Sequence, residues 1–135
     1  MKKLIIVLLG ITILSLTGCN SSGTRKKMET LEDSINQYAF ALRWGRYEDA
    51  YNYHIDEQGN KAEMHLDRLE PIRVTGFHII EKTVNAELTE AMVKGDLNYY
   101  HNEYGTLRKA PLEQTWWYRE EDKKWYLKTP FPEFK

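Results

Sequence analysis

The sequence predicts an α+β fold in which N-terminal helices pack on a curved, mostly antiparallel four-stranded sheet. Before Pro71, apolar residues recur with the helical period, and after it they alternate with a period of two. Helices followed by consecutive antiparallel strands are typical of α+β domains, in which the helices cover one face of the sheet. A charged and apolar segment precedes this domain.

The first eighteen residues predict a cleaved signal peptide. The chain opens with the positively charged MKK, and residues 4–16 are mostly apolar. As a helix, residues 4–16 would rise about 20 Å, which is short for a hydrocarbon core about 30 Å thick. A charged start, a short apolar stretch and small residues before a cut therefore indicate a secretory signal over residues 1–18.

The end of this segment, Leu16-Thr17-Gly18-Cys19, resembles the lipobox of bacterial lipoproteins. The resemblance implies that a diacylglyceryl group is attached to the sulfur of Cys19 and that a dedicated peptidase cuts between Gly18 and Cys19. Cys19 is the only cysteine, so a lipid there leaves no thiol for a disulfide or a metal site. An ordinary cysteine beside an ordinary signal-peptide cut is the alternative.

The same resemblance implies a lipid-anchored protein of the cell envelope. Asn20 follows the cysteine, where an aspartate would resemble an inner-membrane retention signal. We therefore expect the outer membrane, with the protein facing the periplasm, and the outer face of the inner membrane is the alternative. Small, polar and charged residues fill NSSGTRKK, so residues 19–27 are expected to be the lipidated cysteine and a polar tether that reaches at most about 29 Å.

Residues 28–135 are long enough for a single domain with its own core. Loss of Lys2 and Lys3 with the signal reduces the chain's 19 Lys and Arg to 17, against 20 Asp and Glu. A nucleic-acid partner needs a basic face, so this balance argues against one.

Three helical segments are expected in the first half of the domain. One face of an amphipathic helix is formed by Leu31, Ile35, Tyr38, Ala39 and Leu42. Thr30 and Asp33 resemble the capping box that begins such a helix. Gly45 predicts a break before a second helix over residues 46–54, and one helix bent at the glycine is the alternative. A short third helix is expected over residues 62–69, before the next proline.

The strands follow in consecutive order. The first begins after Pro71 and changes face at Gly76, which predicts a β-bulge. Asn85 marks the next turn. The clearest alternation in the chain defines the second strand, whose apolar parity is Ala91, Val93, Gly95, Leu97 and Tyr99. A turn at residues 101–105 leads to a third strand, and the charged turn EEDKK leads to a fourth that begins at Trp125.

Three segments together resemble the cone-shaped nuclear-transport-factor-two-like superfamily. They are AFALRWGRYEDAYNY in the helical part, IRVTGFHII at the start of the sheet and LEQTWWYREEDKKWYL at its end. The last segment is similar to the final hairpin of that superfamily, although Lys124 stands where a glycine is usual. Small exported lipoproteins of this kind also resemble the chain. Because members include isomerases, cyclases, dehydratases and many non-enzymatic partners, the resemblance implies a fold and leaves function open.

An enzyme of this type would need a carboxylate or histidine that projects into the cone. Asp96 has the polar parity of its strand, His101 lies at a turn, and Tyr99 continues the apolar parity. The face of His78 depends on the switch at Gly76. We therefore keep His78 and Tyr99 as weak pocket candidates and assign no catalytic residue.

Two short pairs, His54-x-Asp56 and His65-x-Asp67, contain metal-ligating residue types. A pair cannot fill a tetrahedral shell, and on a helix its members point apart. We expect these histidines at the surface in polar loops, and we expect no metal. The chain also has no glycine-rich phosphate loop and no Gly-x-Ser-x-Gly elbow, so no cofactor is expected.

Two aromatic doublets, Tyr99-Tyr100 and Trp116-Trp117, lie in neighbouring predicted strands. Adjacent strand residues face opposite sides, so each doublet places one ring in the core and one on the far face. If Tyr99 and Trp116 lie inside, Tyr100 and Trp117 lie outside, together with Tyr126. An exposed aromatic surface of this kind predicts a protein partner or a homodimer.

The sequence therefore favours a non-catalytic binding or assembly module that is anchored to the envelope membrane by Cys19. On the sheet face, the alternative is that the stems of Lys128 and Arg119 cover the rings and nothing binds. A small-ligand enzyme or carrier that uses the cone interior is the competing function, and glycan or peptidoglycan contact through exposed rings is a third. A cavity that holds His78 and a carboxylate would favour the enzyme, whereas a cone filled by Trp and Tyr would not.

Overall fold

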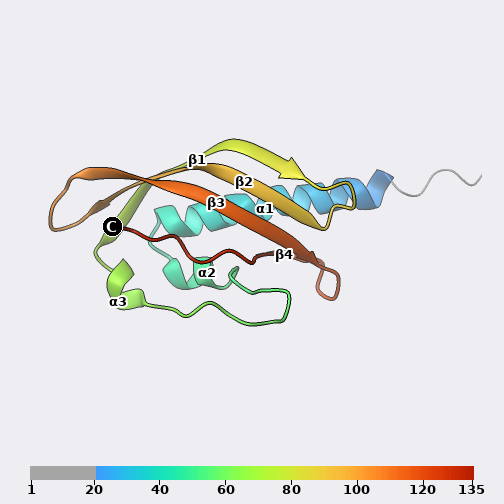
Figure 1. Cartoon of the computed structure of the whole chain (residues 1–135), viewed down its shortest axis with the longest axis horizontal. Coiled ribbons are helices and arrows are strands. Elements are labelled where there is room, and N and C mark those ends of the chain that lie inside the picture. Colours follow the sequence, from blue (N-terminus) through green and yellow to red (C-terminus); the bar gives the residue numbers. More distant parts are fainter. Residues whose placement is uncertain (1–20) are drawn as a thin grey trace, which may run out of the picture.

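A computed structural model shows the fold and describes residues 21–135, so the predicted signal peptide and Cys19 lie outside the described residues. The helices are α1 (Ser21–Arg43), α2 (Tyr47–Tyr51) and α3 (Leu66–Leu69). The strands are β1 (Ile72–Val84), β2 (Glu90–His101), β3 (Leu107–Arg119) and β4 (Lys124–Leu127). They form one antiparallel sheet in chain order (Figure 1), which confirms the predicted α+β class with helix packed on a four-stranded sheet.

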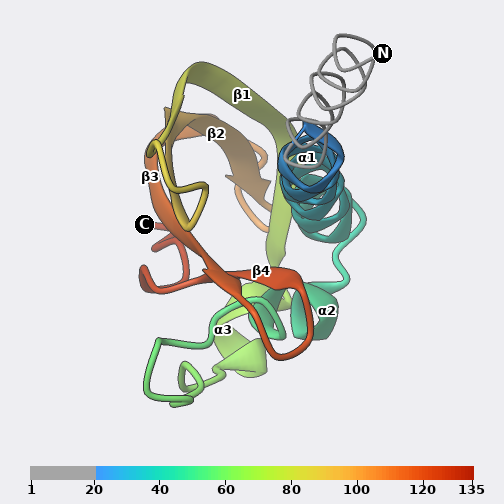
Figure 2. The same ribbon diagram turned by 90° about the vertical axis from the view of Figure 1, so that its right-hand side faces the viewer.

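The sheet is bent into an open curve, and α1 lies along its open side (Figure 2). The apolar face of α1 is buried as its helical spacing predicts: Leu31, Ile35, Tyr38 and Leu42 are essentially inaccessible to solvent. Each aliphatic side chain buried in this way contributes about 1.5–3 kcal/mol. The alternating parity of β2 and β3 supplies the opposing half of the core.

The bulge predicted at Gly76 is present, because the β1–β2 register shifts between Val74 and Gly76. A second shift, between Ile79 and Glu81, was not expected from the sequence. Strands β1 and β2 approach closely near Gly95, where a Cβ atom would lie 1.8 Å from the backbone oxygen of His78. Glycine at this position is therefore a packing requirement rather than a weak strand residue.

The break at Gly45 is also confirmed. Gly45 has a φ of +68°, and the backbone N–H of Arg46 donates to the carbonyl oxygen of Ala41 at 2.8 Å. A left-handed glycine followed by this backward bond is a common end of a helix. The two helices after the break are shorter than predicted, because α2 ends at Tyr51 and α3 spans only Leu66–Leu69.

The tether expected over residues 19–27 is wrong for the part that the structure describes. From Ser21 onward this stretch is helix and forms the first two turns of α1. The indole Nε1 of Trp125 donates to the carbonyl oxygen of Lys27 at 3.1 Å, and the Lys27 ammonium lies 2.8 Å from the Glu120 carboxylate. These contacts from the β3–β4 hairpin hold the polar turns in helical form.

The capping box expected at Thr30 and Asp33 is also wrong, because α1 begins at Ser21, well before Thr30. The hydroxyl of Thr30 donates to the carbonyl oxygen of Lys27 at 2.9 Å, so it bonds backward within a helix that has already begun.

Among residues 21–135, no helix combines the length and the apolar character that crossing a bilayer requires.

Candidate functional site

Aromatic rings fill the space between α1 and the sheet. The ring of Tyr38 lies at the centre, with its centroid 5.8 Å from that of Trp116, 5.9 Å from that of Tyr53 and 6.3 Å from that of Phe77. All three neighbours meet it edge to face, a favourable arrangement for aromatic pairs. Tyr38 and Trp116 are both 0% exposed, so the concave face of the sheet is packed core.

His54 lies beside this cluster and is only 2% exposed, so its expected position at the surface is wrong. Its Nε2 lies 2.9 Å from the hydroxyl of Tyr38, and its Nδ1 lies 2.8 Å from the carbonyl oxygen of Thr129. A carbonyl oxygen only accepts, so we assign the ring proton to Nδ1, and Nε2 accepts from Tyr38. Burial lowers the pKa of His54 to about 4, so the ring is neutral near pH 7.

The other members of the histidine–aspartate pairs do not join His54. The carboxylate of Asp56 accepts hydrogen bonds from the side chain and the backbone N–H of Asn60, which close the loop after α2. These bonds, the side-chain one first, lower the pKa of Asp56. His65 lies 3.8 Å from the Glu63 carboxylate and is partly exposed. Within residues 21–135, no group of three or more His, Cys, Asp or Glu side chains is placed to hold a metal ion.

A surface groove of about 740 Å³ opens beside His54. One wall is the loop between α2 and α3, and the other is the extended segment after β4, residues 128–135. Phe131 holds the second wall, because its ring stacks on that of Tyr51 at 4.0 Å with the two planes 2° apart. Ligand sites in proteins commonly have volumes of about 300–1,000 Å³, and this groove falls within that range.

Exposed cations line the rim of the groove. Lys61 and Arg68 are exposed, and neither side chain forms an ion pair with a residue that the structure describes. Glu133, also on the rim, is likewise without an ion-pair partner in the described part of the chain. Lys135, at the end of the same wall, is exposed and also forms no ion pair with a described residue. The groove therefore combines stacked aromatic rings with unpaired charges of both signs that remain available to a ligand.

A second groove, of about 810 Å³, lies between α1 and the β3–β4 hairpin. Phe40 is half exposed there, and Arg46 already pairs with Asp49 at 2.7 Å. Lys123 and Lys124 also line this groove, are exposed and form no ion pair with a described residue, so this groove too offers cations to a ligand. The groove beside His54 differs in the stacked rings of Tyr51 and Phe131 that line it.

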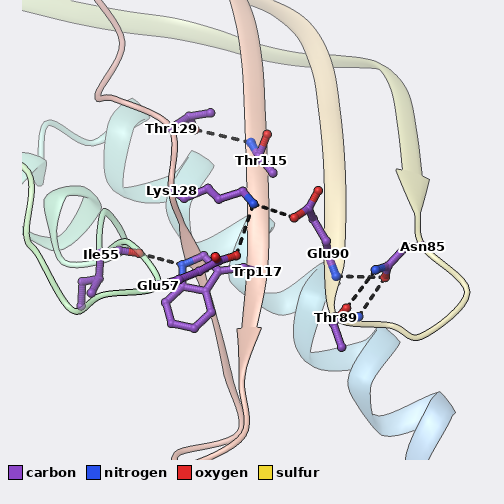
Figure 3. A network of polar contacts seen from close by, with 9 residues as sticks. All are labelled: Ile55, Glu57, Asn85, Thr89, Glu90, Thr115, Trp117, Lys128 and Thr129. Atoms are coloured by element: carbon purple, nitrogen blue, oxygen red, sulfur yellow. Dashed lines mark hydrogen bonds and ion pairs between the residues drawn. The ribbon is translucent and has the colours of Figure 1, made fainter.

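The aromatic surface predicted on the outer face of the sheet is largely covered. Trp117 lies on that face, but its indole Nε1 donates to the carbonyl oxygen of Ile55 at 2.7 Å (Figure 3). Beside it, the ammonium of Lys128 lies 2.6 Å from the Glu90 carboxylate and 3.3 Å from that of Glu57 (Figure 3). The loop after α2 thus folds over Trp117 and is held there by Lys128.

The expectation that Tyr126 is exposed is wrong, because its side chain is only 9% exposed. The guanidinium carbon of Arg119 lies 4.3 Å from the ring centroid of Tyr126, and the tyrosine hydroxyl donates to Asp122 at 2.5 Å. The hydrogen bond from Arg119 lowers the pKa of Asp122 to about 2. Tyr100 is half-buried. The covering of a ring by a long side chain, stated above as the alternative, is what the structure shows for Arg119 over Tyr126. Trp117 is instead bonded by the loop after α2.

The two weak pocket candidates lie on opposite faces of the sheet. His78 is exposed on the outer face, with its Nε2 3.2 Å from the side-chain nitrogen of Asn98. Tyr99 is buried, and its hydroxyl donates to the backbone oxygen of Lys135 at 2.8 Å. The structure therefore does not bring His78 and Tyr99 together, and neither lines the groove beside His54.

Sequence reasoning missed His54 as a core residue, although a signal was present. Tyr47, Ala50, Tyr51 and His54 share helical spacing, which places His54 on an apolar face.

A comparison of the chain with protein families, with curated proteins and with solved structures finds no match.

Proposed function

We propose that the chain is a lipid-anchored envelope protein whose folded domain is a non-catalytic binding or assembly module. The lipobox-like Leu16-Thr17-Gly18-Cys19 supports the anchor. The observation that carries the binding role is that Tyr38 and Trp116 occupy the concave face of the sheet, while the groove beside His54 is open. A catalytic pocket in a cone-shaped fold would lie on the concave side of the sheet, in the space that these two rings fill.

The anchor places the module, in this proposal, on the periplasmic side of the outer membrane. The order of helices and strands and the bulge at Gly76 support the likeness to the cone-shaped nuclear-transport-factor-two-like superfamily.

The chemistry of the groove indicates what it binds. Stacked Tyr51 and Phe131 offer an apolar surface, and Lys61 and Arg68 offer charges that the described part of the protein does not neutralise. Charged groups that lack internal partners favour a partner of opposite sign. Glu133 on the same rim is also unpaired within the described residues and favours a basic group. The expected occupant is therefore a partner segment that combines apolar side chains with an acidic group for Lys61 and Arg68 and a basic group for Glu133.

Photocrosslinking in intact cells tests this proposal. A photoreactive residue at Arg68 is expected to capture one defined partner, whereas the same residue at Arg43, an exposed cation outside the groove, is expected to capture little. With the crosslinker at Glu133, charge reversal by Lys61→Glu should lower the yield several-fold, and Arg43→Glu should leave it unchanged. Equal capture at Arg68 and Arg43 would show that the groove is not the binding site. Capture of a second copy of the chain would identify the partner as another molecule of the same protein.

A further inference from the structure

Three parts of the chain lie at the same end of the domain. They are the first turns of α1, the β1–β2 turn at residues 85–89 and the β3–β4 turn at residues 120–123, and we call this end the base (Figure 1). The ion pair between Lys27 and Glu120 joins α1 to the β3–β4 turn. An ion pair between Lys82 and Glu32 joins α1 to β1 just before the β1–β2 turn.

The predicted lipid attachment point lies close to this base. Only Asn20 separates Cys19 from Ser21, so the Cα atoms of Cys19 and Ser21 are at most about 7 Å apart. From Ser21 to Lys27 the helix rises about 9 Å. The base is therefore within about 16 Å of the lipidated residue, and the headgroup layer of a bilayer takes up about 5–8 Å of that distance.

The helix cannot pivot freely under the domain. Leu31 is 0% exposed in the core, and the bond from Trp125 to the carbonyl oxygen of Lys27 fixes α1 one turn earlier. A flexible eight-residue tether would let the domain take any orientation, but a helix that is continuous with the core transmits the position of its first residue to the whole domain.

From this geometry we infer that the base rests against the lipid headgroups of the bilayer, so that the opposite end of the domain faces away from the membrane. The inference rests on the proposed lipid anchor at Cys19. At the opposite end, the backbone N–H of Asn102 donates to the carbonyl oxygen of Pro71 at 2.8 Å, which ties the β2–β3 turn to the chain just after α3. The α3 end of the groove, with Arg68, is thereby presented to partners in the envelope space.

Geometry rather than charge sets this orientation. Near the base, Arg25 pairs with Glu29 at 2.8 Å, as Lys27 does with Glu120. The exposed cations Lys26 and Lys123 form no ion pair with a described residue, and neither do the exposed acids Glu87 and Glu121 of the same base. Because the unpaired charges are of both signs, they give little net attraction to anionic lipid, and salt screens what remains. The orientation is therefore expected to depend little on ionic strength and on the fraction of anionic lipid.

Headgroup quenching on vesicles tests the inference. Because Cys19 is the only cysteine and would be acylated, a cysteine introduced elsewhere is the single free thiol for a dye. Glu121→Cys labels the base, and Tyr104→Cys, at a side chain 70% exposed, labels the opposite end. The full-length lipidated protein is placed in vesicles of phosphatidylethanolamine and phosphatidylglycerol that carry a nitroxide on the headgroup. We expect quenching at residue 121 to exceed that at residue 104 several-fold.

A matched variant separates orientation from anchoring. Twelve Gly and Ser residues inserted between Asn20 and Ser21 restore a flexible tether, and the difference in quenching should then largely disappear. Equal quenching at both positions in the protein without the insertion, with flotation on vesicles intact, would overturn the inference and leave the anchor standing. Failure of the protein to float with vesicles, together with an unmodified mass at Cys19, would overturn the anchor and this inference with it.

Discussion

The hydroxyl of Tyr38 donates to Nε2 of His54 across 2.9 Å in the core of the domain. The other nitrogen of the same ring bonds to the carbonyl oxygen of Thr129 at 2.8 Å. One buried imidazole thus connects α1, the chain after α2 and the segment that follows β4. That last segment forms one wall of the groove, so the core and the candidate binding site depend on the same side chain.

Substitution of His54 is expected to destabilise the protein. His54→Ala removes both hydrogen bonds and leaves the hydroxyl of Tyr38 buried without this partner. We expect the free energy of unfolding to fall by about 2–4 kcal/mol. The matched control is His65→Ala, because His65 is partly exposed and surface changes usually cost less than about 0.5 kcal/mol. Urea unfolding of the two purified variants measures the difference. Equal stability would show that the buried hydrogen bonds of His54 contribute nothing net.

Stability should also fall in mild acid because of His54. Burial lowers the pKa of this ring from an ordinary value of 6.5 to about 4, so below pH 6.5 the unfolded chain takes up a proton that the folded protein does not. Unfolding is therefore favoured progressively as the pH falls from about 6.5 to about 4, by about 3 kcal/mol in all. Urea unfolding between pH 7 and pH 4.5 should show this slope in the unaltered protein. A His54→Gln variant that keeps the same slope would assign it to other groups.

Gly95→Ala should be strongly destabilising. The added Cβ would lie 1.8 Å from the backbone oxygen of His78, so β1 and β2 would have to move apart. We expect the free energy of unfolding to fall by at least about 2 kcal/mol, as it does at other overpacked sites. Gly23→Ala is the control, because nothing lies within 4 Å of a Cβ atom in that helical position, and alanine favours a helix by up to about 1 kcal/mol. Thermal melts should therefore move in opposite directions, and a fall of similar size in both variants would refute the close contact at Gly95.

Trp117 is expected to hold the loop after α2 rather than to bind a partner. Trp117→Ala removes the hydrogen bond to the carbonyl oxygen of Ile55 and should increase tryptic cleavage after Lys61 several-fold. Tyr100→Ala, a change of similar size on the same face of the sheet, should leave that cleavage rate unaltered. If Trp117→Ala instead abolished crosslinking at Arg68 without any change in cleavage, the exposed-ring interpretation would regain support.

The arrangement of helices and strands was predictable because local periodicity reports which side of an element is buried. Leu31, Ile35 and Leu42 predicted the buried face of α1, and Gly45 predicted its end. The start of α1 was not predictable, because NSSGTRKK has no apolar face of its own. Its helical form is supported by Trp125, 98 residues away from Lys27 in the chain.

The candidate site was less predictable, since it depends on which long side chain lies over which ring. Strand parity placed Trp117 opposite Trp116, but parity does not show that the indole bonds to the carbonyl oxygen of Ile55 in the loop after α2. The groove itself is formed by two segments without regular structure, and such segments leave no periodic pattern to read.

The mass and membrane behaviour of Cys19→Ser test the central claim most directly. From cells, the unaltered protein is expected to begin at Cys19, to carry a diacylglyceryl group and to sediment with membranes. Cys19→Ser is expected to lack the lipid, to escape the cut before residue 19 and to change its fractionation. If Cys19→Ser shows the same processing, the same added mass and the same fractionation as the unaltered protein, the protein is not anchored through this cysteine.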